Sequence, residues 1–94
     1  MILIDFYEAL DELCEKLNGL YNTIREDDNL TLYRLEVHAL KSTSASVGAL
    51  QISEQAKLLE EAAIAGDIER ISCKHPLLME DIAKHKERLA VIIQ

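Results

Sequence analysis

Apolar residues recur at helical spacing along almost the whole chain, and this pattern limits the possible folds more than any other feature. In the first quarter of the sequence they follow one another at steps of three and four, at Leu3, Phe6, Leu10, Leu13, Leu17, Leu20 and Ile24. Such steps place side chains on one face of an α-helix, which turns by about 100° per residue. The segment therefore predicts one long amphipathic helix that tolerates Gly19 at some cost.

Turn-forming residues separate this segment from a second and a third helix. The polar sequence EDDN interrupts the first stripe, and Asn29 at its end is predicted to cap a helix that runs from about residue 30 to residue 47. Gly48 suits the left-handed turn with which many helices end. A third helix is expected from about residue 53 to residue 65, where apolar residues again share one face. The members of this stripe are Ile52, Ala56, Leu59 and Ala63.

A fourth helix is predicted to follow Gly66, which ends the third, and Asp67, which caps the next. Its apolar stripe consists of Ile68, Ile71, Leu78, Ile82, Leu89 and Ile92. Pro76 lacks a backbone N–H, so it should kink this helix or split it near residues 73–75. Four amphipathic helices with short connections pack most simply as an antiparallel bundle. We therefore expect one all-α domain over residues 1–94, an up-down-up-down four-helix bundle whose last helix is kinked near Pro76.

Composition and charge narrow the classes of partner. The 94 residues are 49 % apolar and 29 % charged, which fits one folded core rather than a disordered chain. A formal net charge of −7 disfavours nucleic acids and anionic membrane surfaces as partners. No apolar run reaches the roughly 18 residues of a membrane span. The first apolar stretch, in MILIDF, is interrupted too early by an acidic residue to be the apolar region of a signal peptide. We expect a cytoplasmic monomer in which Cys14 and Cys73 stay reduced.

The second helix places a histidine almost opposite its apolar face. With His38 as the origin, an arc from about 180° to 260° contains Tyr33, Val37, Leu40, Ser44 and Val47. Within about 60° of His38 lie Thr31, Arg34, Leu35, Lys41, Ser42 and Ala45. His38 is therefore predicted to be exposed, in a local positive patch formed by Arg34 and Lys41. A neutral imidazole is a nucleophile, and neighbouring cations attract phosphoryl groups. An ordinary solvated surface histidine would give the same pattern, so periodicity leaves both interpretations open.

The segment HALKSTSASVGAL, which covers residues 38–50, resembles the signature of the histidine-containing phosphotransfer (HPt) domain, H-x-L-K-G-x-S-x-x-x-G-A. The matching residues are His38, Leu40, Lys41, Ser44, Gly48 and Ala49. Asn29 stands where the family usually has a Gly-Asp turn, and AGDIERI is similar to the turn before the family's last helix. Ser42 departs from the pattern, because the family usually has a glycine there that leaves space for the docking partner.

This resemblance implies a carrier in a phosphorelay. It implies that His38 accepts a phosphoryl group from the aspartate of one response-regulator receiver domain, on the ring nitrogen farther from the backbone, and passes it to the aspartate of another. Lys41 would stabilise the phosphoryl group, and the helical wheel adds Arg34 as an assisting residue. No bound cofactor and no metal are expected, because the Mg²⁺ that the transfer needs belongs to the receiver. Autonomous kinase or ATPase activity is not expected either.

The remaining expectations concern docking and context. Receivers are expected to dock on Leu35, Ser42 and Ala45, together with the first helix near Ile4 and Tyr7. Gly48 is expected to serve structure by ending its helix. The chain length matches a bare domain, which favours a piece of a hybrid sensor histidine kinase over a free-standing protein.

Two interpretations from other classes stay open. A purely structural or protein-interaction bundle is supported only by the long seam of the first helix, and it predicts that His38→Gln changes nothing. A metal-binding bundle would use histidines and carboxylates, and Cys73 and His75 in the sequence CKH offer two donors. The chain has no Glu-x-x-His pair of the kind that di-metal bundles use, so His75 and His85 are expected to be packing or rim residues.

Overall fold

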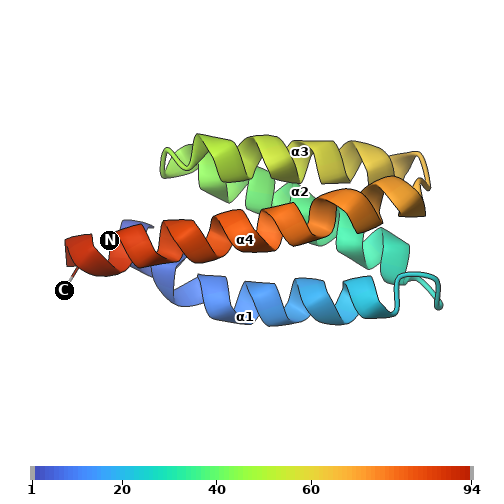
Figure 1. The fold of residues 1–94 in the computed structure, drawn as a ribbon, viewed down its shortest axis with the longest axis horizontal. Coiled ribbons are helices and arrows are strands. Elements are labelled where there is room, and N and C mark those ends of the chain that lie inside the picture. Colours follow the sequence, from blue (N-terminus) through green and yellow to red (C-terminus); the bar gives the residue numbers. More distant parts are fainter. Residues whose placement is uncertain (1, 94) are drawn as a thin grey trace.

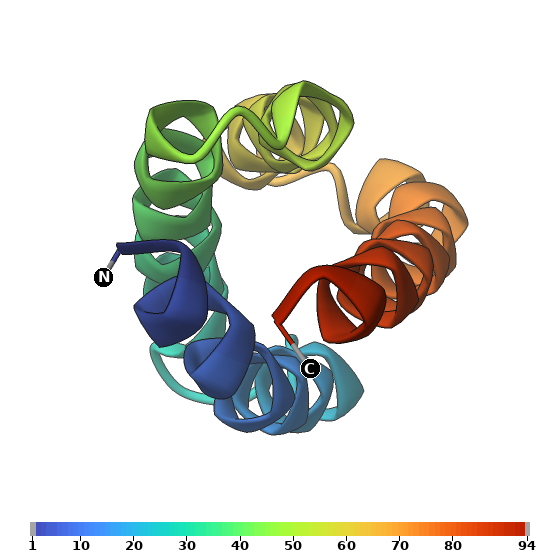
Figure 2. The same ribbon diagram turned by 90° about the vertical axis from the view of Figure 1, so that its left-hand side faces the viewer.

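The computed structural model describes the backbone of residues 2–93 and the side chains of residues 6–91. Its elements are α1 (Ile2–Asn22), α2 (Asn29–Ser46), α3 (Leu50–Ile64) and α4 (Ile68–Ile93). Figure 1 shows the α2–α3 turn at one end of the molecule and the other two connections at the opposite end. Each helix contacts the next one along the chain, and α1 also contacts α4, so the four form the closed ring seen in Figure 2. The predicted up-down-up-down bundle is confirmed.

The core runs along the axis of this ring and is built from the predicted stripes. All four helices contribute, with Phe6, Leu10, Leu17, Tyr33, Val37, Leu40, Ile52, Ala56, Leu59, Ile71, Leu78, Ile82 and Leu89 among the buried residues. The predicted inner arc of α2 is buried, except that Val47 at its end is only partly buried. The stripe residues Leu3 and Ile92 lie outside the described side chains. Burial of aliphatic side chains on all four helices is the main contribution that holds the bundle together.

The turns confirm part of the predicted capping. Gly48 and Gly66 have φ values of 79° and 69°, the left-handed conformation in which glycine is not strained. Asp67 caps α4, because its Oδ1 accepts a hydrogen bond from the backbone N–H of Arg70 at 3.1 Å.

Two predicted helix starts are corrected. Asn29 is the first residue of α2 rather than its cap, and its side-chain amide donates to the backbone oxygen of Thr23 at 3.1 Å and to Thr23 Oγ1 at 2.6 Å. It therefore ties together the α1–α2 connection. The third helix begins at Leu50, earlier than expected, because the left-handed Gly48 reverses the chain so tightly that Ala49 alone separates it from α3.

Pro76 does not split α4, so that alternative was wrong. The helix is continuous from Ile68 to Ile93 and is drawn in Figure 1 as one bent ribbon. The proline removes the N–H that would bond the carbonyl of Ser72 one turn earlier. Both residues are exposed, so water can solvate that carbonyl without breaking the helix.

His75 joins α4 to two other helices and is 3 % exposed. Its Nε2 lies 2.7 Å from Asn18 Oδ1, its Nδ1 lies 2.7 Å from the hydroxyl of Tyr33, and the ring stacks on Tyr21 at a centroid distance of 4.2 Å. Because the Asn18 oxygen only accepts, Nε2 carries the proton and Nδ1 accepts from Tyr33. Burial lowers the pKa of His75 to about 4. The expected packing role of this histidine is confirmed.

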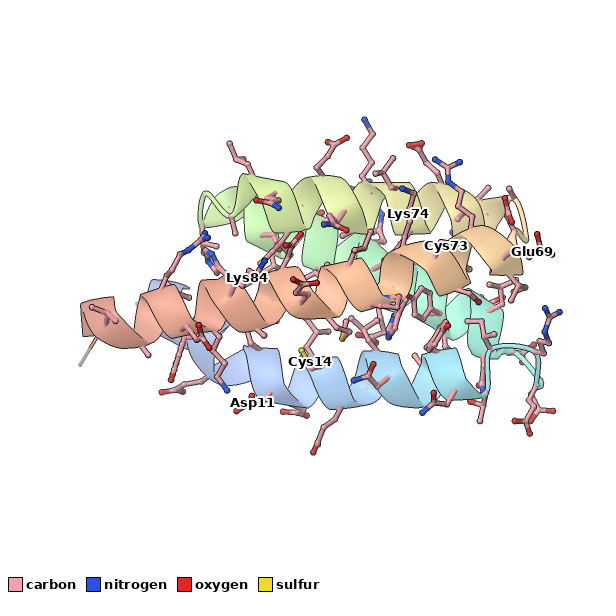
Figure 3. All side chains as sticks on the ribbon, in the orientation of Figure 1. Asp11, Cys14, Glu69, Cys73, Lys74 and Lys84 are labelled. Atoms are coloured by element: carbon pink, nitrogen blue, oxygen red, sulfur yellow. The ribbon has the colours of Figure 1, made fainter. Side chains whose placement is uncertain are left out.

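The two cysteines are both free, as predicted, and Figure 3 shows them at separate places on α1 and α4. Cys73 is exposed, and burial raises the pKa of the half-buried Cys14. None of the helices described over residues 2–93 combines the length and the apolar character that a membrane crossing requires.

Candidate functional site

His38 lies in the middle of α2 with its side chain 57 % exposed, as the helical wheel predicted. The buried side chains of Val37 and Leu40 anchor the opposite side of the helix in the core. Because α2 is fixed by that packing, the imidazole is held at the surface in a defined direction.

A carboxylate from another helix contacts this histidine, and the sequence analysis missed it. Glu60 of α3 accepts a hydrogen bond from His38 Nδ1 through Oε2, and its Oε1 lies 2.6 Å from Lys41 Nζ. Its side chain is only 12 % exposed. The hydrogen bond from Lys41, followed by the one from His38, lowers the pKa of Glu60, although burial opposes the shift. The carboxylate is therefore ionised at neutral pH and joins the two residues.

This contact fixes the chemistry of the imidazole ring. An ionised carboxylate only accepts hydrogen bonds, so Nδ1 of His38 must carry the proton that it donates to Glu60. Whenever the ring is neutral, its Nε2 is therefore unprotonated. Among the described side chains, residues 6–91, no hydrogen bond to this nitrogen is found. The exposed face of α2 therefore presents a nitrogen lone pair that is oriented and free to react.

The predicted positive patch is corrected by the same contact. Lys41 is on the predicted side of α2, but its charge is paired with Glu60. The half-buried Arg34, one turn before His38, forms no ion pair with any side chain that the structure describes. The charges of Lys41 and Glu60 thus cancel, and the charge of Arg34 is left without a described carboxylate beside it. A helical wheel of α2 could not show this, because the carboxylate comes from the neighbouring helix.

One sequence signal does point to Glu60. It lies one turn after Ala56 and directly after Leu59, so it borders the apolar stripe that faces the core. An ionisable residue at that edge rarely stays buried without a partner.

Ser53 of α3 also donates a hydrogen bond to the backbone oxygen of Lys41 at 2.9 Å, which fixes α3 beside the site.

The other residues that were predicted to belong to the site lie in different parts of the fold. Leu35, Ser42 and Ala45 are exposed on α2, and Gly48 ends the helix as expected. Tyr7 is partly buried, with the Lys86 ammonium 5.6 Å from its ring centroid, so it faces α4 and not His38. The side chain of Ile4 lies outside the described residues.

The histidine and acidic side chains of residues 6–91 do not gather into a metal centre. Within the described part of the chain, no three His, Cys, Asp or Glu side chains are placed to hold one ion. His75 is occupied by its partners in the core, and His85 packs edge-on against Phe6 at a centroid distance of 5.9 Å.

A comparison with family sequence models identifies the relatives of this bundle. The model of the Hpt domain matches residues 1–90. The chain belongs to the Hpt domain family. Hpt domains act in histidine phosphotransfer within phosphorelays and interact with the receiver domains of response regulators. Neither the curated proteins nor the solved structures gave a match to the chain.

Proposed function

We propose that this Hpt domain carries a phosphoryl group on Nε2 of His38, receiving it from one receiver aspartate and delivering it to another. The observation that supports this most directly is the contact of Glu60 with Nδ1, together with the exposure of the ring. An ordinary surface histidine needs no buried carboxylate from a second helix. The contact selects one tautomer and leaves the other nitrogen accessible to a partner protein.

The transfer step needs no base on this chain. The Nε2 lone pair attacks the phosphorus of the aspartyl phosphate, the N–P bond forms, and the bond from phosphorus to the aspartyl oxygen breaks to release a carboxylate. The proton on Nδ1 stays in its hydrogen bond to Glu60, which offsets the positive charge that develops on the ring. The Mg²⁺ in the receiver supplies electrostatic stabilisation of the phosphoryl oxygens. Reversal of the same step delivers the group to the next receiver.

Two cations can stabilise the carried group. Lys41 lies three residues after His38, so its ammonium can turn from Glu60 to a phosphoryl oxygen. Arg34 lies one turn before His38 and is not paired with a described carboxylate. The ion pair with Glu60 holds Lys41 near the site before the phosphoryl group arrives.

The surface around His38 suits docking of a protein partner. We define the docking face as the exposed α2 residues Leu32, Leu35, Ala39, Ser42 and Ala45. Two of them are large apolar residues with about half of their surface open to solvent, Leu32 at 45 % and Leu35 at 50 %. The others are small and let another backbone approach the ring. Leu32 was not predicted from the sequence.

Leu35→Asp is expected to weaken binding of a receiver domain by roughly tenfold or more, because an apolar contact is lost and a charge is buried. Leu77→Asp on α4 is the matched control, since Leu77 is 49 % exposed and lies outside the docking face. Titration calorimetry measures affinity, and thermal melting checks that both variants are folded. Equal affinities for the two variants would remove Leu35 from the interface.

Incubation with a phosphorylated receiver and Mg²⁺ tests the function itself. Wild type should take up label that is lost in acid and survives alkali, as expected of a phosphoramidate, whereas His38→Gln should take up none. His85→Gln is the control and should be labelled like wild type, because His85 lies beside Phe6 and away from the docking face. Label that persists in His38→Gln would refute the site, and no transfer to wild type from any receiver would favour a structural bundle.

A further inference from the structure

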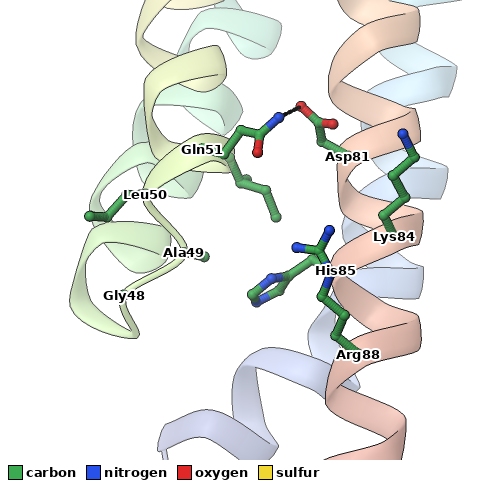
Figure 4. Close-up of a pocket in the computed structure, with 9 residues that line it drawn as sticks. Gly48, Ala49, Leu50, Gln51, Asp81, Lys84, His85 and Arg88 are labelled. Carbon is green, nitrogen blue, oxygen red and sulfur yellow. Dashed lines mark hydrogen bonds between the residues drawn. The ribbon is translucent and has the colours of Figure 1, made fainter.

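A cavity of about 390 Å³ lies between the α2–α3 turn and α4. Its walls are the α2–α3 turn and the start of α3, residues 48–52, and the side chains of Asp81, Lys84, His85 and Arg88. None of the residues of the proposed transfer site lines it. Figure 4 shows the imidazole of His85 and the guanidinium of Arg88 directed from α4 into the space between α4 and the start of α3.

Arg88 differs in its pairing from Lys84 and Lys86, the two lysines just before it on α4. Lys84 pairs with Glu80 at 3.0 Å, and Lys86 pairs with Asp11. Arg88 has no ion pair within the described side chains, although the chain has 17 acidic residues. Its guanidinium therefore brings several N–H donors to the cavity without a carboxylate to accept them.

His85 is the second polar group at the cavity without a protein partner. Its Nε2 is buried and forms no hydrogen bond with any group in the described part of the chain. Burial and, to a lesser extent, the nearby charge of Arg88 lower the pKa of His85. An anion bound beside these residues would oppose both effects, because it would favour the protonated ring.

The start of α3 adds positive potential to the same space. The backbone N–H groups of Gln51 and Ile52 are in the first turn of the helix, where no intrahelical acceptor exists, and neither has a backbone partner within residues 2–93. The helix dipole places partial positive charge at this end.

Asp81 is the only carboxylate among the residues that line the cavity. Its Oδ2 accepts a hydrogen bond from Gln51 Nε2 at 3.2 Å and another from Gln55 Nε2. These amides partly satisfy its charge. Lys84 is paired with Glu80, so Arg88 is the basic side chain on the wall that has no ion pair in the described part of the chain.

We propose that this cavity binds a phosphate-type oxyanion, either inorganic phosphate or a small phosphomonoester, through the Arg88 guanidinium, the His85 ring and the first-turn amides of α3. The donors come from two helices on different sides of the space. A tetrahedral anion offers acceptor oxygens in several directions, whereas a planar carboxylate has only two oxygens. The site is separate from His38 and does not depend on the proposed phosphotransfer.

Titration of the ¹⁵N-labelled chain with sodium phosphate at constant ionic strength tests this proposal by NMR. Saturable shifts are expected at the amides of Gln51 and Ile52, and Arg88→Gln should weaken binding by roughly tenfold or more. Arg70→Gln, which changes an exposed arginine on the same helix outside the cavity, should leave binding unchanged. His38→Gln should also bind as wild type does.

Titrations with other anions identify which class of anion the cavity binds. Tighter binding of glycerol phosphate than of inorganic phosphate assigns the site to a phosphomonoester, and the reverse order assigns it to inorganic phosphate. Acetate that binds as tightly as either would overturn the assignment to phosphate chemistry. The site itself is overturned by shifts that do not saturate, by shifts centred on His38 and Lys41, or by an unchanged affinity in folded Arg88→Gln, with folding checked by circular dichroism.

Discussion

Glu60→Ala is expected to slow phosphoryl transfer to His38 by on the order of 100-fold while the bundle stays folded. Without the carboxylate, the imidazole samples both tautomers and rotates freely, so Nε2 is unprotonated and correctly aimed only part of the time. Lys41 also loses the partner that holds it beside the ring. Stopped-flow or quench measurements with a phosphorylated receiver give the rate.

Two variants separate positioning of the ring from a general loss of stability. Glu61→Ala removes the neighbouring exposed glutamate and should transfer at the wild-type rate. Glu60→Gln keeps an oxygen that can accept from Nδ1, so its rate should lie between those of wild type and Glu60→Ala. The ¹⁵N chemical shifts of His38 should report an Nδ1–H tautomer in wild type and a mixture in Glu60→Ala. An unchanged tautomer and an unchanged rate in Glu60→Ala would show that the carboxylate does not act through the ring.

Acidification from pH 6.5 to pH 4 should cost the protein roughly 3 kcal/mol of unfolding free energy through His75 alone. The pKa of this histidine is about 4 in the folded chain, below its ordinary value of 6.5. The unfolded chain therefore binds the proton first as the pH falls. The contribution of His75 to stability is complete above about pH 6.5 and is lost progressively toward pH 4.

His75→Gln isolates this contribution, because glutamine does not titrate and can offer both a donor and an acceptor to Asn18 and Tyr33. Urea denaturation at pH 7 and at pH 4.5 gives the free energies of unfolding for both proteins. The wild type should lose more stability than the variant between these two pH values. If both lost the same amount, the buried neutral histidine would not explain the acid sensitivity.

The architecture of this domain was predictable because it depends on properties of single helices. The apolar stripe of α1 and the left-handed glycines at Gly48 and Gly66 are local features, and the structure reproduces them. The wheel of α2 placed Tyr33 inside and His38 outside correctly. Each of these predictions needs only helical geometry and the separation of apolar from polar side chains.

The site was only half predictable, because its partners come from different helices. The contact between Glu60 and His38 depends on how α3 is rotated against α2, and no periodicity within α2 contains that information. The contact of His75 with Asn18 is of the same kind, since it joins residues from the first and last helices. Asn29 is not the cap because α2 already begins at this residue, and its side-chain amide donates to Thr23 in the preceding connection.

The position of the phosphoryl group on the ring tests the central claim most directly. Phosphorylated, ¹⁵N-labelled protein can be examined by NMR for coupling between phosphorus and the nitrogens of His38. The account predicts an N–P bond at Nε2, with the Nδ1 proton still shared with Glu60. A phosphoryl group on Nδ1, or on any residue other than His38, would contradict it.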